Sequence, residues 1–112
     1  KTTFGGIYVE IKENFSDRAG RGILRFDCAK IPENAVIRTR KSGDSFTKFG
    51  GGTKSLGDFM TDRKIPLRLR DRLPLIAAGN EILAVCGVEI SDKIRITENT
   101  EKIGGIYCPI TL

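Results

Sequence analysis

Histidine and tryptophan are absent from the 112 residues, and cysteine occurs only three times, at Cys28, Cys86 and Cys108. Without an imidazole side chain, a Ser-His-Asp or Cys-His mechanism and a histidine-ligated metal site are excluded. The cysteines lie far apart and form no C-x-x-C pair, which argues against a zinc ribbon or a thioredoxin-like redox motif. Their odd number is typical of a reducing, cytoplasmic compartment. We interpret them as small hydrophobic side chains in strands.

Long apolar runs are also missing. No stretch approaches the roughly 20 apolar residues that a membrane-spanning helix needs, and no apolar leader of the signal-peptide kind opens the chain. Hydrophobic residues make up 39% and charged residues 29% of the sequence, as in folded proteins. This length supports one modest core, so we expect a single domain over residues 1–112. Because the first residue is Lys1, we expect a domain taken from a longer protein.

Positive charge is abundant but unevenly distributed. The chain has 19 Lys and Arg against 14 Asp and Glu, for a net charge of +5. Residues 38–72 hold ten of the basic and four of the acidic side chains, so this third of the chain carries +6 and the remainder −1. A concentrated basic region predicts a polyanionic partner such as nucleic acid. A solvated basic surface without a partner is the alternative.

The spacing of apolar residues predicts two kinds of structure. Alternation predicts β-strands in the first and last thirds of the chain, over residues 7–11, 23–26, 35–40, 81–85, 93–97 and 105–112. In the middle, Leu56, Phe59 and Met60 follow helical spacing, with Thr53 or Ser55 as the N-cap. Pro66 suits the first turn of a second short helix. Strands, a helical insertion and strands again predict a β-rich α+β domain, with a basic loop-helix-helix segment at residues 38–74.

Several local features in this segment bear on binding. On a strand over residues 35–40, Arg38 and Arg40 would share one face. The glycines at 50–52 precede Lys54 without the Gly-Lys order of a P-loop. This loop either presents free backbone N–H groups at a helix start to a phosphate, with Lys54 adding charge, or merely connects two elements. Phe49, beside the glycines, is the best aromatic candidate for exposure and base stacking.

Acidic side chains show no catalytic pairing. Asp58 and Asp71 are expected to form ion pairs with basic residues close in sequence. With neither a carboxylate pair nor a nucleophile–base pair visible, we predict no catalytic residue, no metal site and no cofactor in this chain. An independent small enzyme is therefore the weakest interpretation.

Residues 37–87 carry a set of motifs in a specific order. They read I-R-T-R-K-S-G-D-S-F, then G-G-G-T-K-S-L-G-D-F-M-T-D-R-K-I-P, then R-D-R-L-P-L, and finally E-I-L-A-V-C-G. Together they resemble the C-terminal domain of bacterial tRNA(Ile)-lysidine synthetase, and residues 96–100 resemble its final segment. The positions that match are Arg38, Arg40, Gly43, Asp44, Lys54, Asp58, Lys64, Ile65, Pro66, Arg70, Pro74 and Leu75. The chain departs from the family pattern at Lys48, Gly57, Arg68 and Ala84, where Pro, Lys, an aromatic residue and Trp are common.

The resemblance implies a parent enzyme with an N-terminal PP-loop domain. That domain would use ATP and Mg²⁺ to adenylate the wobble cytidine of an isoleucine tRNA and then attach lysine to it. Its Ser-Gly-Gly and Asp-Ser signature is absent here, so the resemblance implies no ligase site in this chain. The C-terminal domain would hold isoleucine tRNA by its acceptor stem. Its fold is similar to a domain of the phenylalanyl-tRNA synthetase β subunit, with sandwiched β layers.

These observations predict a tRNA-binding module that contacts phosphates through basic side chains. Asp44 and Asp58 are expected to hold loops and helix in place instead. The candidate RNA contacts are Arg38, Arg40, Lys54, Arg63, Lys64, Arg68, Arg70 and Arg72. The alternative is a structural module that docks on the rest of its own chain and has little direct contact with RNA.

Overall fold

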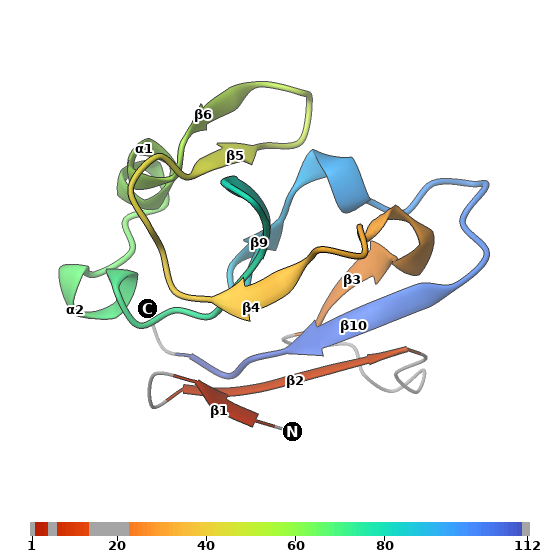
Figure 1. The fold of residues 1–112 in the computed structure, drawn as a ribbon, viewed down its shortest axis with the longest axis horizontal. Helices are drawn as coiled ribbons and strands as arrows, with labels where there is room; N and C mark the ends of the chain where they lie inside the picture. The colour runs from red at the N-terminus through yellow and green to blue at the C-terminus, as the bar shows by residue number, and fades with distance from the viewer. Residues whose placement is uncertain (1, 5–6, 14–22, 111–112) are drawn as a thin grey trace.

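Two β-sheets lie against each other in the computed structural model, which describes residues 2–4, 7–13 and 23–110 (Figure 1). The first sheet is antiparallel and has the strand order β1-β2-β10-β3. The last strand of the chain therefore lies between two of the first. The strands of this sheet are β1 (Thr2–Phe4), β2 (Ile7–Glu13), β3 (Ile23–Asp27) and β10 (Ile103–Tyr107).

The second sheet has the order β4-β7-β8-β5-β6, and β9 pairs with β8. Strands β5 and β8 are parallel, and the other pairs are antiparallel. Its strands are β4 (Val36–Arg38), β5 (Ser45–Thr47), β6 (Thr53–Ser55), β7 (Leu75–Ala78), β8 (Glu81–Val85) and β9 (Glu89–Ile90). The helices are α1 (Leu56–Asp62) and α2 (Leu67–Arg70), with short 3₁₀ turns η1 (Cys28–Lys30) and η2 (Asp92–Ile94).

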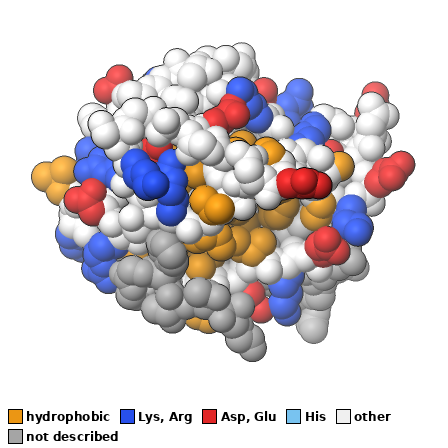
Figure 2. Space-filling view, viewed as in Figure 1, with side chains coloured by type: hydrophobic (Ala, Val, Ile, Leu, Met, Phe, Trp, Pro, Cys, Tyr) orange, Lys and Arg blue, Asp and Glu red, His pale blue; other side chains and the backbone are white. Residues whose placement is uncertain are grey.

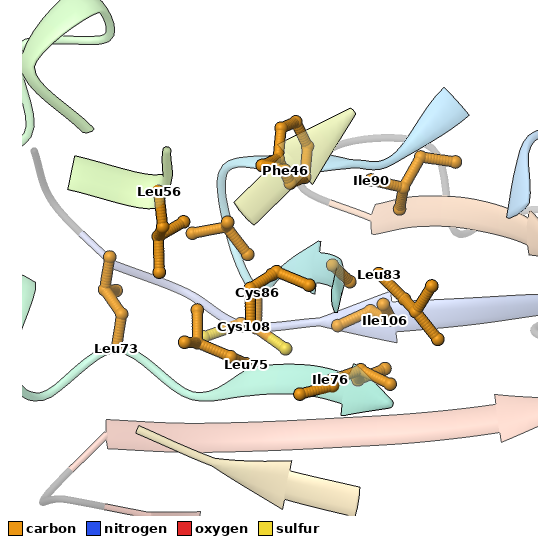
Figure 3. Close-up of a cluster of buried hydrophobic side chains, with 14 of the residues drawn as sticks. Phe46, Leu56, Leu73, Leu75, Ile76, Leu83, Cys86, Ile90, Ile106 and Cys108 are labelled. Atoms are coloured by element: carbon orange, nitrogen blue, oxygen red, sulfur yellow. The ribbon is translucent and has the colours of Figure 1, made fainter. Parts of the chain in front are cut away.

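One hydrophobic cluster joins both sheets and the two helices. Figure 3 shows side chains from the two sheets, among them Leu75 of β7 and Ile106 of β10, close together in this core. Leu56 and Phe59 enter the same cluster from α1. Burial of this apolar surface is the main force that holds the sheets together. The prediction of a sheet-dominated mixed domain with two short helices is confirmed.

Helix α1 begins where the sequence predicts. The Ser55 side chain accepts a hydrogen bond from the Asp58 amide, so Ser55 and not Thr53 is the N-cap. Helix α2 starts directly after Pro66, and it buries Leu69 while the following Leu73 is fully enclosed. Among the described residues, no helix is long and apolar enough to cross a membrane.

The strands predicted over residues 7–11, 23–26 and 81–85 are confirmed, but the strand over residues 93–97 is wrong. There the Ser91 hydroxyl accepts from the Lys93 amide and starts η2, and Ile94 turns into the core. The strand predicted over 105–112 runs over Ile103–Tyr107 instead. It includes Gly104, which pairs with Glu13 and Phe26. A Cβ at Gly104 would lie 2.5 Å from Phe26 Cζ, so a larger residue would force the ring to shift.

Two further differences lie in the basic segment. The strand predicted over 35–40 ends at Arg38, so Arg38 and Arg40 do not share a strand face. The loop of the predicted loop-helix-helix segment contains the β5–β6 hairpin, which joins the second sheet. Both differences arise because pairing with distant strands, β7 for β4 and β8 for β5, decides where these short strands form.

The cysteines differ in their burial. Cys86 and Cys108 lie in the core, and burial raises their thiol pKa to about 12 and about 11. Cys28 is half-buried, with a pKa raised less by the same cause. Because the thiolate is the reactive form, we expect iodoacetamide at pH 8 to modify Cys28 first. Cys86 and Cys108 should react only in denaturant, as mass spectrometry of the labelled peptides would show. Equal labelling of all three in the folded protein would contradict this expectation.

Candidate nucleic-acid interface

The basic segment forms one side of the molecule. Figure 2 shows Lys and Arg side chains along the side that carries α1 and α2 in Figure 1. The eight predicted contact residues all lie in the described part of the chain. They differ in whether their charged groups already form hydrogen bonds or ion pairs within the protein.

Arg38 is used to build the fold. Its guanidinium donates two hydrogen bonds to Asp44, at 3.0 Å and 2.8 Å, and others to the carbonyls of Thr39 and Gly79. The side chain is only 14% exposed. The structure therefore gives Arg38 a role in holding the turn after β4 and the β7–β8 turn together, with few donors left for a ligand.

Asp44 sits at the centre of this network. Burial would raise the pKa of Asp44, but hydrogen bonds from Arg38, the Lys41 amide and Asn80 outweigh it and lower the pKa to about 2. The carboxylate thus joins β4, the turn after it and the β7–β8 turn. The expectation that Asp44 holds the loops is confirmed. The Asp58 carboxylate, in contrast, forms no hydrogen bond or ion pair with the described residues, although the Asp58 amide donates to the Ser55 hydroxyl.

Three more candidates, Arg40, Lys54 and Arg63, are held in ion pairs. Arg40 donates to Asp71 at 2.7 Å, and Lys54 pairs with Asp62. The predictions that Asp58 and Asp71 pair with their sequence neighbours are therefore wrong. The observed partners, Asp71 for Arg40 and Asp62 for Lys54, lie farther apart in the sequence and are brought close by the fold. Arg63 pairs with Glu89 and lies 5.6 Å above the Phe59 ring.

The remaining candidates lie on and around α2. Arg70 donates to the Ile65 carbonyl at 2.8 Å and to Thr61, which ties α2 to the end of α1. Arg72 is exposed. Lys64 and Arg68 are exposed and form no ion pair with the described residues. Lys64 and Arg68 are therefore exposed positive charges that no carboxylate of the described residues neutralises.

The glycine loop is the hairpin connection between β5 and β6. Lys48 and Gly52 share a backbone hydrogen bond across it, and Gly50 and Gly51 take positive φ values of 97° and 94°. The loop leads into β6, so the expectation that it feeds a helix start directly is wrong. Phe49, next to the glycines, is 51% exposed, so its predicted exposure is confirmed.

A groove lies between the turn after β4 and the start of α1. It has a volume of about 510 Å³ and we call it the serine groove. Its lining comprises Arg40, Lys41, Ser42, Gly43, Asp44, Ser45, Ser55, Leu56, Gly57 and Asp71. Periodicity does not predict this lining, because Lys41, Ser42 and Ser45 lie around the turn between β4 and β5 while Ser55 caps α1. The only signal was the excess of basic residues around Lys41.

A second hollow, of about 290 Å³, lies between the sheets and is mostly apolar. Its lining is Ile11, Lys12, Glu13, Phe26, Cys28, Ile31 and Ile76. Figure 2 shows hydrophobic side chains gathered in the middle of the face of the molecule drawn there. Within residues 7–13 and 23–110, no three His, Cys, Asp or Glu side chains come together as metal ligands would. The charged groove and the basic residues near α2 are thus the best candidates for recognition of a polyanion.

Comparison with known proteins identifies the family of this chain. Residues 35–106 match the model of the TilS substrate C-terminal domain family. The tRNA(Ile)-lysidine synthase of Caldanaerobacter subterraneus is 39% identical over 89% of this chain and 22% of its own length. That of Clostridium tetani is 47% identical over 70% of this chain and 17% of its own.

A crystal structure of a TilS C-terminal domain has the same fold. It superposes with a TM-score of 0.65 at 30% sequence identity, covering 91% of this chain and 81% of that one. The chain spans about a fifth of the length of the curated relatives. From its sequence and its fold alike, the chain belongs to the family of TilS substrate C-terminal domains.

Proposed function

We propose that this chain holds isoleucine tRNA for a tRNA(Ile)-lysidine synthase. Catalysis would take place in a separate part of that enzyme, which uses ATP and Mg²⁺ to join lysine to the wobble cytidine. The observation that supports this role is the pair of exposed cations, Lys64 and Arg68, without ion-pair partners among the described residues. The relatives carry tRNA(Ile) in their names, which indicates the same partner.

Binding of this kind would rest on phosphate contacts. A-form RNA hides its base edges in a deep major groove, so proteins grip duplex RNA through phosphates and 2′-hydroxyls. Lys64 and Arg68 meet phosphates without breaking any contact within the described residues. Arg40, Lys54 and Arg63 must share their charge with a carboxylate, and exposed ion pairs of this type are worth only about 0–1 kcal/mol. The acceptor stem, as a regular duplex, is the part of tRNA that we propose for this surface.

Two finer expectations belong to this proposal. The resemblance supports a sandwich-like arrangement similar to that in the phenylalanyl-tRNA synthetase β subunit. We also propose a cytoplasmic location for the protein, because its proposed partner, tRNA, is found there.

A second function is favoured by the apolar face. Val36 and Ile37 lie on β4, the edge strand of the second sheet, and are 53% and 39% exposed. Ile37 pairs with Ile76, which lines the apolar hollow. A structural module that docks on the rest of its own chain would use such a face. This role and RNA binding occupy different residues, so variants of Lys64 and Arg68 separate them.

The proposed function predicts a steep salt dependence. If about five basic side chains meet phosphates, the affinity for isoleucine tRNA should fall with a log–log slope of about −3.5 to −4.5. A titration with whole tRNA and with an acceptor-stem duplex, at several salt concentrations, measures this slope. Absence of saturable binding even at low salt would overturn the proposal and favour the docking role.

Charge reversal at two positions tests the surface itself. The double variant Lys64→Glu and Arg68→Glu should bind about 30-fold more weakly, because each lost contact is worth about 1 kcal/mol. Its salt slope should become shallower by about 1.5. The control, Arg25→Glu with Lys102→Glu, changes the net charge equally at the first sheet. Arg25 lies in β3, Lys102 directly precedes β10, and both residues are exposed. Equal losses in the two variants would mean that only net charge matters.

A further inference from the structure

Lys41 brings a positive charge to the serine groove that the rest of the described chain leaves unpaired. Its side chain is exposed and forms no ion pair within the described residues, while its amide donates to Asp44 at 2.7 Å. Its backbone is thus fixed by the Asp44 network, and the ammonium extends from a rigid turn. Arg40 adds a second cation to the lining.

Three hydroxyl groups line the same groove from two segments of the chain, with Ser42 and Ser45 on one and Ser55 on the other. Ser55 accepts from the Asp58 amide, which leaves its own O–H free to donate. The hydroxyls of Ser42 and Ser45 form no hydrogen bond with the described residues. Hydroxyl groups around a cation are the donors that a phosphate oxygen takes, because each supplies an O–H directed at the anion.

The acidic residues of the lining do not repel an anion equally. The Asp44 side chain is 1% exposed, and its oxygens accept from Arg38, the Lys41 amide and Asn80, so it belongs to the wall. Asp71 is 79% exposed and holds Arg40 by one hydrogen bond. An exposed pair of this kind is weak. An entering anion can therefore take the place of Asp71 at Arg40.

We propose that the serine groove binds a phosphodiester of the RNA backbone, held by Lys41, Arg40 and the serine hydroxyls. This inference rests on the proposed RNA-binding function and adds a specific subsite to it. The groove differs from the surface around Lys64 and Arg68 because uncharged donors from a rigid wall set the position of the phosphate. It thus fixes how the RNA lies, whereas the open cations supply attraction.

Gly57 offers a test that leaves the fold intact. It lies in the groove lining, and nothing is within 4 Å of the place a Cβ would take. Gly57→Glu and Gly57→Gln have nearly the same shape, and both residues favour a helix more than glycine does. We expect Gly57→Glu to bind an acceptor-stem duplex about tenfold more weakly than Gly57→Gln, because a carboxylate there repels the phosphate.

Two further variants separate the donors from the charge. Ser42→Ala with Ser45→Ala should weaken binding and leave the salt slope unchanged, since neither hydroxyl releases counterions. Lys41→Gln should make the slope shallower by about 0.9, whereas the control Lys102→Gln should not. These variants also serve if Gly57→Glu proves unable to fold.

The outcomes distinguish the subsite from the function it rests on. Suppose that the unmodified chain binds and the Lys64 and Arg68 variant weakens, while every groove variant binds like its control. The groove proposal is then wrong, and the proposed function stands. If the unmodified chain does not bind RNA at low salt, the proposed function fails and the subsite falls with it.

Discussion

Replacing Asp44 with alanine is expected to lower the free energy of unfolding by about 3–5 kcal/mol. The variant leaves the Arg38 guanidinium, 14% exposed, without the carboxylate that takes two of its hydrogen bonds. The Lys41 amide and Asn80 lose their acceptor at the same time. Urea unfolding followed by far-UV circular dichroism measures the loss.

Asp71 provides a matched control for this experiment. It forms an ion pair of similar length with Arg40, at 2.7 Å, but its side chain is 79% exposed. Asp71→Ala should therefore cost less than about 1 kcal/mol. Equal destabilisation by the two variants would show that burial does not set the strength of the Asp44 network.

The same network predicts a pH dependence. The pKa of Asp44 is lowered from 3.8 to about 2 in the folded protein. A lowered pKa means that the carboxylate stabilises the fold above pH 4, and that this contribution is lost as the pH falls towards 2. The contribution at neutral pH is about 2 kcal/mol. Asp44→Ala should lack this part of the acid dependence, so the stability difference between the two proteins should narrow on acidification.

Phe46→Ala should destabilise the protein by a comparable amount, about 3–5 kcal/mol. The Phe46 ring is fully buried between the second sheet and α1. The centroid of its ring lies 4.2 Å from the centroid of the Phe59 ring. Truncation leaves a cavity where Phe59 of α1 packs against the second sheet. The measurement is again urea unfolding at neutral pH.

Phe49, in the same hairpin, is the control. It is 51% exposed, so Phe49→Ala should change the stability by less than about 0.5 kcal/mol. If Phe49 stacks on a base, the same variant should weaken RNA binding by about 1–3 kcal/mol. A large loss of stability in Phe49→Ala, or none in Phe46→Ala, would contradict the packing described for this hairpin.

Local patterns in the sequence predict the local structure well. The strand over Glu81–Val85 and the capped helix at Leu56 follow from periodicity and a hydroxyl at the N-cap. Residues 93–97 show the limit of periodicity, because Ile94 and Ile96 alternate as in a strand while Ser91 starts a 3₁₀ turn. The β5–β6 hairpin escapes prediction because β5 is defined by its parallel partner β8, far along the chain.

The candidate site shows a different limit. The family motif contains Arg38, Gly43 and Asp44, and the sequence identifies the family from them. The sequence alone does not distinguish a residue that binds RNA from one that stabilises the fold, because both kinds of residue are polar. The structure assigns Arg38 to the fold through its contacts with Asp44 and Gly79. The partners of Arg40 and Lys54 lie beyond helical spacing, so no local rule finds them.

The position of β10 has a consequence for synthesis of the protein. Ile106 pairs with Ile11 on one side and with Leu24 on the other, so β10 completes two ladders at once. On the ribosome, which adds roughly 5–20 residues per second, β2 and β3 emerge several seconds before the strand that separates them. During that interval their backbone edges have no partner from β10 and are open to other chains. The domain can therefore reach its final fold only after its last strand has left the ribosome.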